Sequence, residues 1–207
     1  MSKNLLYIAD PMCSWCWGFA PAIEAIAQRY ESQLTIKPVM GGLRALNRTP
    51  MDDAQKAEIA EHWNHVNERT GQPFDMSFFD RNEFVYDTEP ACHAVCVVRV
   101  LKPGLTLLYL SALQEAFYTE NRDITDEAVL CEIAEGLRID GARFLSLFKD
   151  VMSVYETAGD FHMARQMQVT GYPSIVLNKG DQYAMLTAGY QPLEDLLPAL
   201  DDWLAQS

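Results

Sequence analysis

The stretch that decides the fold is DPMCSWCWGF, residues 10–19, in which two residues separate Cys13 from Cys16. A short apolar run, residues 5–8, precedes it and is typical of a buried strand. Residues 19–30 follow with apolar side chains at i, i+3, i+4 and i+7, which is the helical period. The sequence therefore places the cysteine pair at a junction between a strand and a helix.

A helix start favours the anionic form of a thiol. Its first N–H groups lack partners inside the helix, and the aligned peptide dipoles add roughly half a positive charge. A thiol of pKa ~8.5 is about 3% ionised at pH 7, whereas one of pKa ~6 is about 90% ionised. Because the thiolate is the nucleophile in disulfide exchange, we expect Cys13 to be the exposed attacking residue and Cys16 to resolve the mixed disulfide.

The spacing of the pair allows two other interpretations. A zinc site usually needs a second pair, and the nearest one, Cys92 and Cys96, has three intervening residues in a segment of helical pattern. Two buried, inert thiols are the other alternative, since cysteine is often buried. The pair Cys13 and Cys16 stands beside two tryptophans and outside any periodic apolar face. We therefore favour redox chemistry and expect no metal.

The composition is that of a globular protein with a real core, because 49% of the 207 residues are hydrophobic and 22% are charged. The net charge of −13, with no basic stripe, argues against partners such as nucleic acid or an anionic membrane surface. The first residues lack the pattern of a signal peptide, and the apolar runs are too short to span a membrane. We expect a cytoplasmic protein whose five cysteines are mostly thiols.

Predicted strands come only from the two ends of the chain. The first end reads as strand, helix and strand, which implies a parallel pair with a right-handed crossover. Pro173 opens the second end, which reads as two antiparallel strands and a leucine-striped helix. The predicted strands are 5–8, 34–39, 173–177 and 183–186, and the terminal helices are 19–30 and 192–204.

The middle of the chain is almost entirely helical in pattern. Thr125 is the expected N-cap of one of its helices, with acidic residues after it in the first turn. The other predicted helices are 52–69, 89–101, 105–118, 140–149 and 155–169. The whole order is therefore βαβ, a helical insertion, and ββα.

This order, with Cys-x-x-Cys at the first strand–helix junction and a proline before the third strand, resembles the thioredoxin fold. The insertion resembles the DsbA-like branch of that family, and the motifs FYTE at 117–120, ITD at 124–126 and GYP at 171–173 resemble its cytoplasmic FrnE-like members. The resemblance implies an α/β fold with a mixed sheet. It implies a thioredoxin-like domain from residues 1–45 and 165–207, and a helical insertion from 46–164.

The resemblance also assigns roles to residues. It implies that Pro173 is a cis proline facing the cysteines and that the backbone of Tyr172 binds the substrate chain as an added strand. Trp15, between the cysteines, is expected to be exposed as an apolar landing surface for substrate. Strongly oxidising periplasmic relatives carry a histidine where this chain has Ser14 and Trp15, so the redox direction stays open.

The favoured function is a thiol–disulfide oxidoreductase or isomerase that acts on protein or peptide disulfides. It needs no bound cofactor, and glutathione is a candidate redox co-substrate. The alternative is a glutathione-dependent enzyme of the kappa-class transferase or 2-hydroxychromene-2-carboxylate isomerase type. Those enzymes have the same layout but a serine at the matching place, so the two cysteines count against it. A third hypothesis is a binding protein with incidental thiols.

Other reactive side chains have structural interpretations. Asp10 either relays a proton to or from Cys16 or caps the turn, and we favour the cap. Cys92 and Cys96 share one helix face while His93 points elsewhere, so core packing is favoured over a second redox pair. Three further residues without evident ligand partners are interpreted as core or polar helix surface, namely Cys131, His62 and His65.

Overall fold

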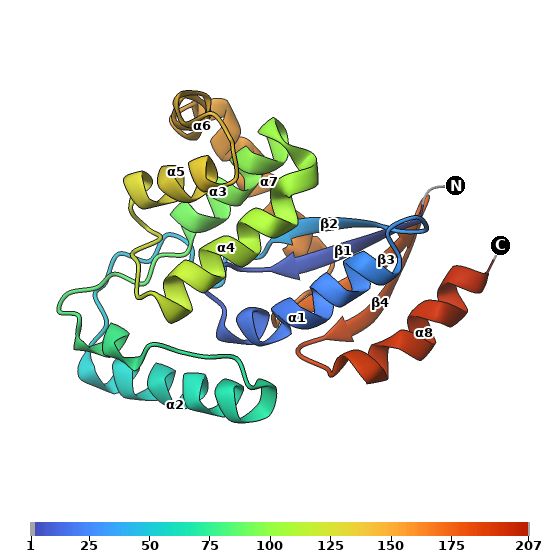
Figure 1. The fold of residues 1–207 in the computed structure, drawn as a ribbon, viewed down its shortest axis with the longest axis horizontal. Helices are drawn as coiled ribbons and strands as arrows, with labels where there is room; N and C mark the ends of the chain where they lie inside the picture. The colour runs from blue at the N-terminus through green and yellow to red at the C-terminus, as the bar shows by residue number, and fades with distance from the viewer. Residues whose placement is uncertain (1–2, 207) are drawn as a thin grey trace.

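Residues 3–206 are described by the structure, a computed structural model, and they form one four-stranded sheet with helices on both faces (Figure 1). The strand order is β2-β1-β3-β4. β1 pairs in parallel with β2, and β3 runs antiparallel to both of its neighbours, so the sheet is mixed as predicted. The strands are β1 (Lys3–Ala9), β2 (Thr35–Met40), β3 (Ser174–Lys179) and β4 (Gln182–Ala188).

One face of the sheet carries the larger core. α1 (Ser14–Arg29) and α8 (Leu193–Ala205) pack there, side by side across the strands (Figure 1). β1 contributes Leu5 and Tyr7 to this face, because alternate side chains of a strand point the same way. The cysteine pair, at the start of α1, therefore lies at the end of the central strand β1.

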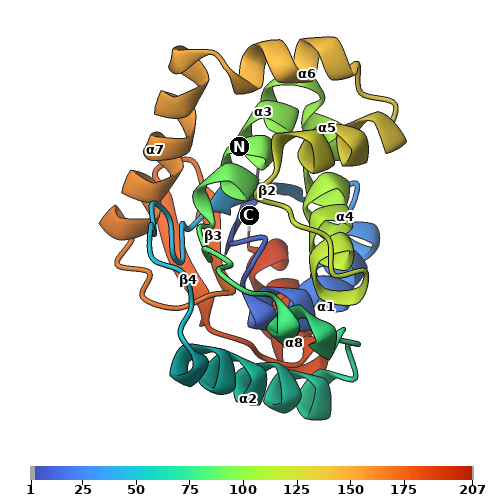
Figure 2. The same cartoon turned by 90° about the vertical axis from the view of Figure 1, so that its left-hand side faces the viewer.

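The other face is covered by α7 (Val151–Gln166), which Figure 2 shows on the side of the sheet away from α8. Leu6 and Ile8 of β1 pack there against Ala164 of α7 in a smaller apolar cluster. The helices α3 (Glu89–Leu101), α4 (Thr106–Thr119) and α7 also contact β2 and so cover that edge of the sheet.

The segment between β2 and β3 is the predicted helical insertion. It also holds two short 3₁₀ helices that the pattern did not predict. Within residues 3–206, no helix has the length and apolar character needed to cross a membrane. The elements of the insertion, besides α7, are α2 (Asp53–Thr70), η1 (Met76–Asp80), α3 (Glu89–Leu101), η2 (Pro103–Leu105), α4 (Thr106–Thr119), α5 (Glu127–Gly136) and α6 (Gly141–Phe148).

Three predicted helix starts are wrong. α7 begins at Val151 instead of residue 155, because Asp150 caps it by accepting the Met152 N–H at 2.9 Å. α1 begins at Ser14 instead of residue 19, because Cys13 is an extended N-cap whose carbonyl accepts the N–H of Cys16 at 2.9 Å. α5 is capped by Asp126, which accepts the Ala128 N–H at 2.7 Å. Thr125 is not the cap, because its hydroxyl is bonded to Asp123.

Pro21 lies inside α1 and removes one helix hydrogen bond. The carbonyl that loses its donor belongs to Trp17, and the Gln72 side chain supplies a replacement at 3.0 Å. The Trp17 indole N–H in turn donates to the Pro73 carbonyl at 3.0 Å. The carbonyl that the proline leaves without a donor and the Trp17 indole thus bind α1 to the segment that follows α2.

Candidate active site

Cys13 lies at the bottom of a cleft of about 270 Å³. Only 5% of its surface is exposed, so the expectation of an exposed attacking residue is wrong. The walls come from α2, from the chain after β2, and from Tyr86 and Tyr172. The Cys13 thiol donates a hydrogen bond of 3.7 Å to the carbonyl of Tyr172. A partner must therefore reach this sulfur through the cleft.

Cys16 lies one turn into α1 and is completely buried. Burial raises the pKa of its thiol well above the ordinary value, and a hydrogen bond and charge from Cys13 raise it further. In residues 3–206 all the cysteines are free thiols. The pair thus consists of one sulfur at the floor of a cleft and a second, neutral sulfur behind it.

Asp10 holds the turn that presents the cysteines. Its carboxylate accepts the N–H of Met12 at 2.9 Å and the N–H of Leu43 at 2.7 Å, and its backbone carbonyl accepts the Cys13 N–H at 3.1 Å. The side chain is fully buried, and burial raises the pKa of its carboxyl although the two N–H bonds lower it. Asp10 thus caps the cysteine turn, which is the role that the sequence favoured, and it also binds the loop after β2 through the Leu43 N–H.

Tyr172 and Pro173 form the opposite side of the site, with the peptide bond between them in the cis form. The Tyr172 hydroxyl donates to the Gly41 carbonyl at 2.8 Å. Its ring lies so close to Gly41 that a Cβ there would be 2.2 Å from a ring carbon. The missing side chain at Gly41 is what allows the loop to place the Tyr172 carbonyl against Cys13.

Gly41→Ala is expected to slow disulfide exchange about tenfold while the protein stays folded. The added methyl group must displace the Tyr172 ring, and a misplacement of about 1 Å near a reacting group can cost up to a hundredfold in rate. The measurement is the exchange rate with a disulfide-bonded peptide. Gly104→Ala is the matched control, because nothing lies within 4 Å of the added Cβ. Equal rates for the two variants would contradict this role of Gly41.

Trp15 is half-buried, so the expectation of an exposed tryptophan is only partly met. Its ring lies 5.3 Å from that of Tyr190 and 5.6 Å from that of His65. His62, one helical turn before His65, lines the cleft beside Trp15. The two histidines of α2, interpreted as polar surface, therefore border the site.

Arg44 and Tyr86 are among the cleft residues that the sequence did not indicate. The Arg44 guanidinium lies 5.4 Å from the centre of the Tyr86 ring. The Tyr86 hydroxyl donates to the carbonyl of Met12 at 2.6 Å. Within the part of the chain that the structure describes, Arg44 forms no salt bridge. The one available signal in the sequence was that Arg44 closely follows Gly41 and Gly42, where the chain turns away at the end of a predicted strand.

Cys92 and Cys96 lie on α3 and are buried in the core, which is the role that the sequence favoured for them. The Cys92 thiol donates to the Asp10 carboxylate at 3.4 Å, and the Cys96 thiol donates to the Asp160 carboxylate at 3.6 Å. Burial raises the pKa of both thiols. The two cysteines thus support carboxylates that are bonded to other elements.

His93 is buried and fully bonded. One ring nitrogen lies 2.8 Å from the Thr157 hydroxyl and the other lies 3.0 Å from the Phe148 carbonyl. Among residues 3–206, no group of three or more histidine, cysteine, aspartate or glutamate side chains is arranged to hold a metal ion. His93 therefore joins α3 to α6 and α7.

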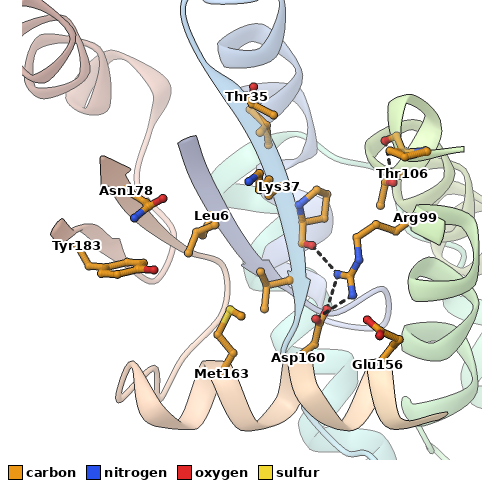
Figure 3. A pocket seen from close by; sticks show the side chains of 14 residues that line it. Leu6, Thr35, Lys37, Arg99, Thr106, Glu156, Asp160, Met163, Asn178 and Tyr183 are labelled. Atoms are coloured by element: carbon orange, nitrogen blue, oxygen red, sulfur yellow. Dashed lines mark hydrogen bonds and ion pairs between the residues drawn. The ribbon is translucent and has the colours of Figure 1, made fainter. Parts of the chain in front are cut away.

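A second cavity, of about 550 Å³, opens between β2, α7 and the start of β4 (Figure 3). Arg99 extends over it to form two bonds with Asp160, of 2.7 and 2.9 Å, and a third with the Pro38 carbonyl at 3.1 Å. Met163 and Tyr183 form its apolar side. None of its lining residues also lines the cleft at Cys13.

Comparison with known proteins gives one family match and several relatives. The family model described as Thioredoxin matches residues 6–196. A crystal structure of a candidate protein disulfide isomerase from Nitrosomonas europaea has 39% sequence identity and a TM-score of 0.92, over 100% of this chain and 99% of that one. The cytosolic disulfide reductase DsbM from Pseudomonas aeruginosa has 24% identity and a TM-score of 0.82, over 99% and 100% of the two chains, which shows the fold alone.

The ClpXP adapter protein SpxH from Bacillus subtilis is 27% identical over 174 residues. The match covers 83% of this chain and 57% of that protein. The chain thus spans less than two thirds of the length of this relative.

Proposed function

Because this chain belongs to the thioredoxin family and its structural neighbours are disulfide oxidoreductases, we propose that it is a thiol–disulfide oxidoreductase with Cys13 as nucleophile and Cys16 as resolving residue. The observation that carries the proposal is the Cys13 thiol bonded to the Tyr172 carbonyl at the floor of the cleft, with Cys16 buried behind it. Cytoplasmic location is part of the proposal, supported by the DsbM neighbour.

The reaction runs in two exchange steps. The Cys13 thiolate attacks one sulfur of a substrate disulfide, forms a mixed disulfide with it and releases the other substrate sulfur as a thiolate. Cys16 then loses its proton and attacks the Cys13 sulfur, which forms the Cys13–Cys16 disulfide and releases the second substrate thiolate. The protein is oxidised by two electrons and the substrate disulfide is reduced. The reverse sequence oxidises a substrate dithiol.

Tyr172, Pro173 and Trp15 are proposed to bind the substrate chain. The Tyr172 carbonyl accepts a hydrogen bond from the Cys13 thiol in the resting protein. A substrate backbone N–H is a stronger donor than a thiol and would replace it, in the manner of strand addition. Trp15 offers an apolar ring at the rim, next to His65 and Tyr190.

Asp10 keeps its second candidate role as a proton acceptor for Cys16. Burial raises the pKa of its carboxyl towards neutral pH, where a carboxylate can accept and release a proton more readily. Besides burial, the negative charge of Asp10 raises the pKa of the Cys16 thiol. Asp10→Asn removes this capacity and also one of the two oxygens that accept the N–H groups of Met12 and Leu43. A relay therefore predicts that the variant slows resolution of mixed disulfides by a larger factor than it slows attack on substrates. Equal slowing of the two steps would leave Asp10 with its capping role.

The test is to mix the reduced protein with an excess of a disulfide-bonded peptide and follow intact mass. The proposal predicts loss of two hydrogen atoms, with peptide mapping that joins Cys13 to Cys16. Release of two peptide thiols per protein should accompany it. A protein that stays reduced, while its fold is intact, would overturn the assignment.

Glutathione is proposed as the small-thiol partner, because its carboxylates suit the unpaired cation of Arg44 in the cleft and because the DsbM neighbour is also known in a structure with GSH. Arg44→Gln is expected to slow reduction of the Cys13–Cys16 disulfide by glutathione about fivefold, the size of a partly exposed charge contact of roughly 1 kcal/mol. Reduction by an uncharged thiol should not change.

Arg48→Gln is the control for this prediction, since Arg48 pairs with Asp87 and does not line the cleft. Equal slowing by Arg44→Gln with the charged and the uncharged thiol would contradict an electrostatic role and indicate a general distortion of the site.

A second candidate function is partner binding, which the adapter name of the SpxH relative favours. Under this hypothesis the thiols are incidental. A variant with serine at both Cys13 and Cys16 would then bind its protein partner as the parent does, and the reduced parent would fail the mass test above.

A further inference from the structure

Tyr7 is a buried phenol with an unsatisfied hydroxyl. It lies in the central strand β1 with 1% of its surface exposed. Its hydroxyl has no hydrogen-bonding partner of good geometry within the described range 3–206. Buried polar groups nearly always have partners, so an orphan hydroxyl in a core calls for a functional explanation.

The Tyr7 ring lies 5.9 Å from that of Phe19, which follows Cys16 by one helical turn on α1. Burial raises the pKa of the Tyr7 phenol, and the charge of Cys16 and a hydrogen bond to it raise that pKa further, so the hydroxyl is next to the Cys16 thiol. Tyr7 and Cys16 belong to the same core cluster, where α1 crosses the end of β1. The charged or titratable groups that act on the two side chains are Cys13, Asp10 and Glu24. Cys13 lines the cleft and Cys16 does not. Although burial raises the pKa of the Cys16 thiol, a hydrogen bond from the backbone of Asp10 lowers it. Tyr7 is therefore the side-chain hydroxyl donor available to that sulfur.

We propose that the Tyr7 hydroxyl donates a hydrogen bond to the sulfur of Cys16 when that sulfur carries negative charge, and so lowers the barrier for Cys16 to attack and to leave. This inference rests on the proposed disulfide exchange, in which Cys16 must become anionic inside the core. Hydrogen bonds to a charged acceptor are roughly twice as strong as those between neutral groups.

The exchange step balances without a proton from Tyr7. In resolution, Cys16 gives its own proton to water or to Asp10, its sulfur bonds to the Cys13 sulfur, and the substrate thiolate leaves with the electron pair of the broken bond. In the reverse step, an incoming thiolate attacks the Cys13 sulfur, the Cys13–Cys16 bond breaks, and Cys16 leaves as the thiolate. Burial raises the pKa of the Tyr7 phenol well above its ordinary value, so the hydroxyl keeps its proton throughout.

The contribution of Tyr7 belongs to the transition state alone. At neutral pH the Cys16 sulfur is uncharged both in the thiol and in the disulfide, because burial raises the pKa of the thiol. Charge on that sulfur appears only while the bond forms or breaks. Removing the donor should therefore slow both directions by one factor and leave the equilibrium with glutathione unchanged.

The experiment compares Tyr7→Phe with the parent at pH 7. Three quantities are measured with glutathione as the probe: the rate of forming the mixed disulfide at Cys13, the rate of its resolution by Cys16, and the rate of opening the Cys13–Cys16 disulfide. Tyr7→Phe should slow resolution and opening about tenfold each, as expected for one lost bond to a charged sulfur. Attack by Cys13 and the equilibrium constant should stay the same.

Tyr109→Phe is the matched control, since it removes a buried hydroxyl that donates to the Leu130 carbonyl at 2.8 Å, away from the cysteines. It should leave all three rates unchanged. Unaltered resolution in Tyr7→Phe, or a shifted equilibrium with unaltered rates, would overturn the proposal for Tyr7. A parent that forms no mixed disulfide would overturn both the proposed function and the inference that rests on it.

Discussion

Cys13→Ser is expected to lower the rate of disulfide exchange by more than about a hundredfold, the largest effect on activity that the site predicts. A serine hydroxyl is not ionised near neutral pH and is a poor nucleophile towards sulfur, so the first exchange step has no attacking group. Shape and burial hardly change, because oxygen replaces sulfur in a side chain of similar size. The measurement is the initial rate of thiol release from a disulfide-bonded peptide.

Cys131→Ser provides the control for this variant. Cys131 is also buried, at 8% exposure, but its thiol donates to the Gly141 carbonyl in the helical insertion. It should keep the parental exchange rate. If Cys13→Ser retained activity and Cys131→Ser lost it, the nucleophile would lie in the insertion and the assignment of Cys13 would be wrong.

Trp63→Ala is expected to lower the free energy of unfolding by about 3–5 kcal/mol, the largest effect on stability that the fold predicts. Trp63 is 1% exposed on α2 and is the largest fully buried side chain. Its ring centre lies 4.8 Å from that of Phe79 and 5.0 Å from those of Phe78 and Tyr118. Truncation leaves a cavity in this aromatic cluster. Urea titration with tryptophan-independent detection, such as circular dichroism, measures the loss.

Trp63 also lines the cleft at Cys13, so exchange activity should fall together with stability. Trp203→Ala is the control, because Trp203 is only partly buried on α8, where its ring faces the Lys3 ammonium at 5.4 Å. It should cost clearly less. Equal losses of stability in the two variants would mean that the aromatic cluster does not anchor α2.

Much of the fold was predictable because its signals are local. The apolar run before Cys13 and the leucine stripe before residue 204 each indicate one element through their period. The start of α1 was not predictable in this way. Ser14 and Trp15 carry no capping signal, and Cys13 caps the helix through its backbone alone. At the start of α5, Thr125 and Asp126 are adjacent and both are residue types that cap helices. The sequence does not show that the Thr125 hydroxyl binds Asp123 and leaves Asp126 as the cap.

The cysteine pair was predictable from spacing, but its surroundings were not. The burial of Cys13 depends on walls that come from α2 and from Arg44, Tyr86 and Tyr172, which are distant in sequence. The fit of the Tyr172 ring over Gly41 arises the same way, since 131 residues separate the two. Such contacts follow from the packing of the insertion against the sheet, which no local pattern encodes.

The central claim is that Cys13 attacks and Cys16 resolves. Its most direct test is to mix reduced Cys16→Ala with a disulfide-bonded peptide, quench with acid and map the adduct by mass spectrometry. The account predicts a stable one-to-one mixed disulfide at Cys13, which the parent protein forms only transiently. An adduct at Cys92, Cys96 or Cys131, or no adduct from a folded protein, would contradict it.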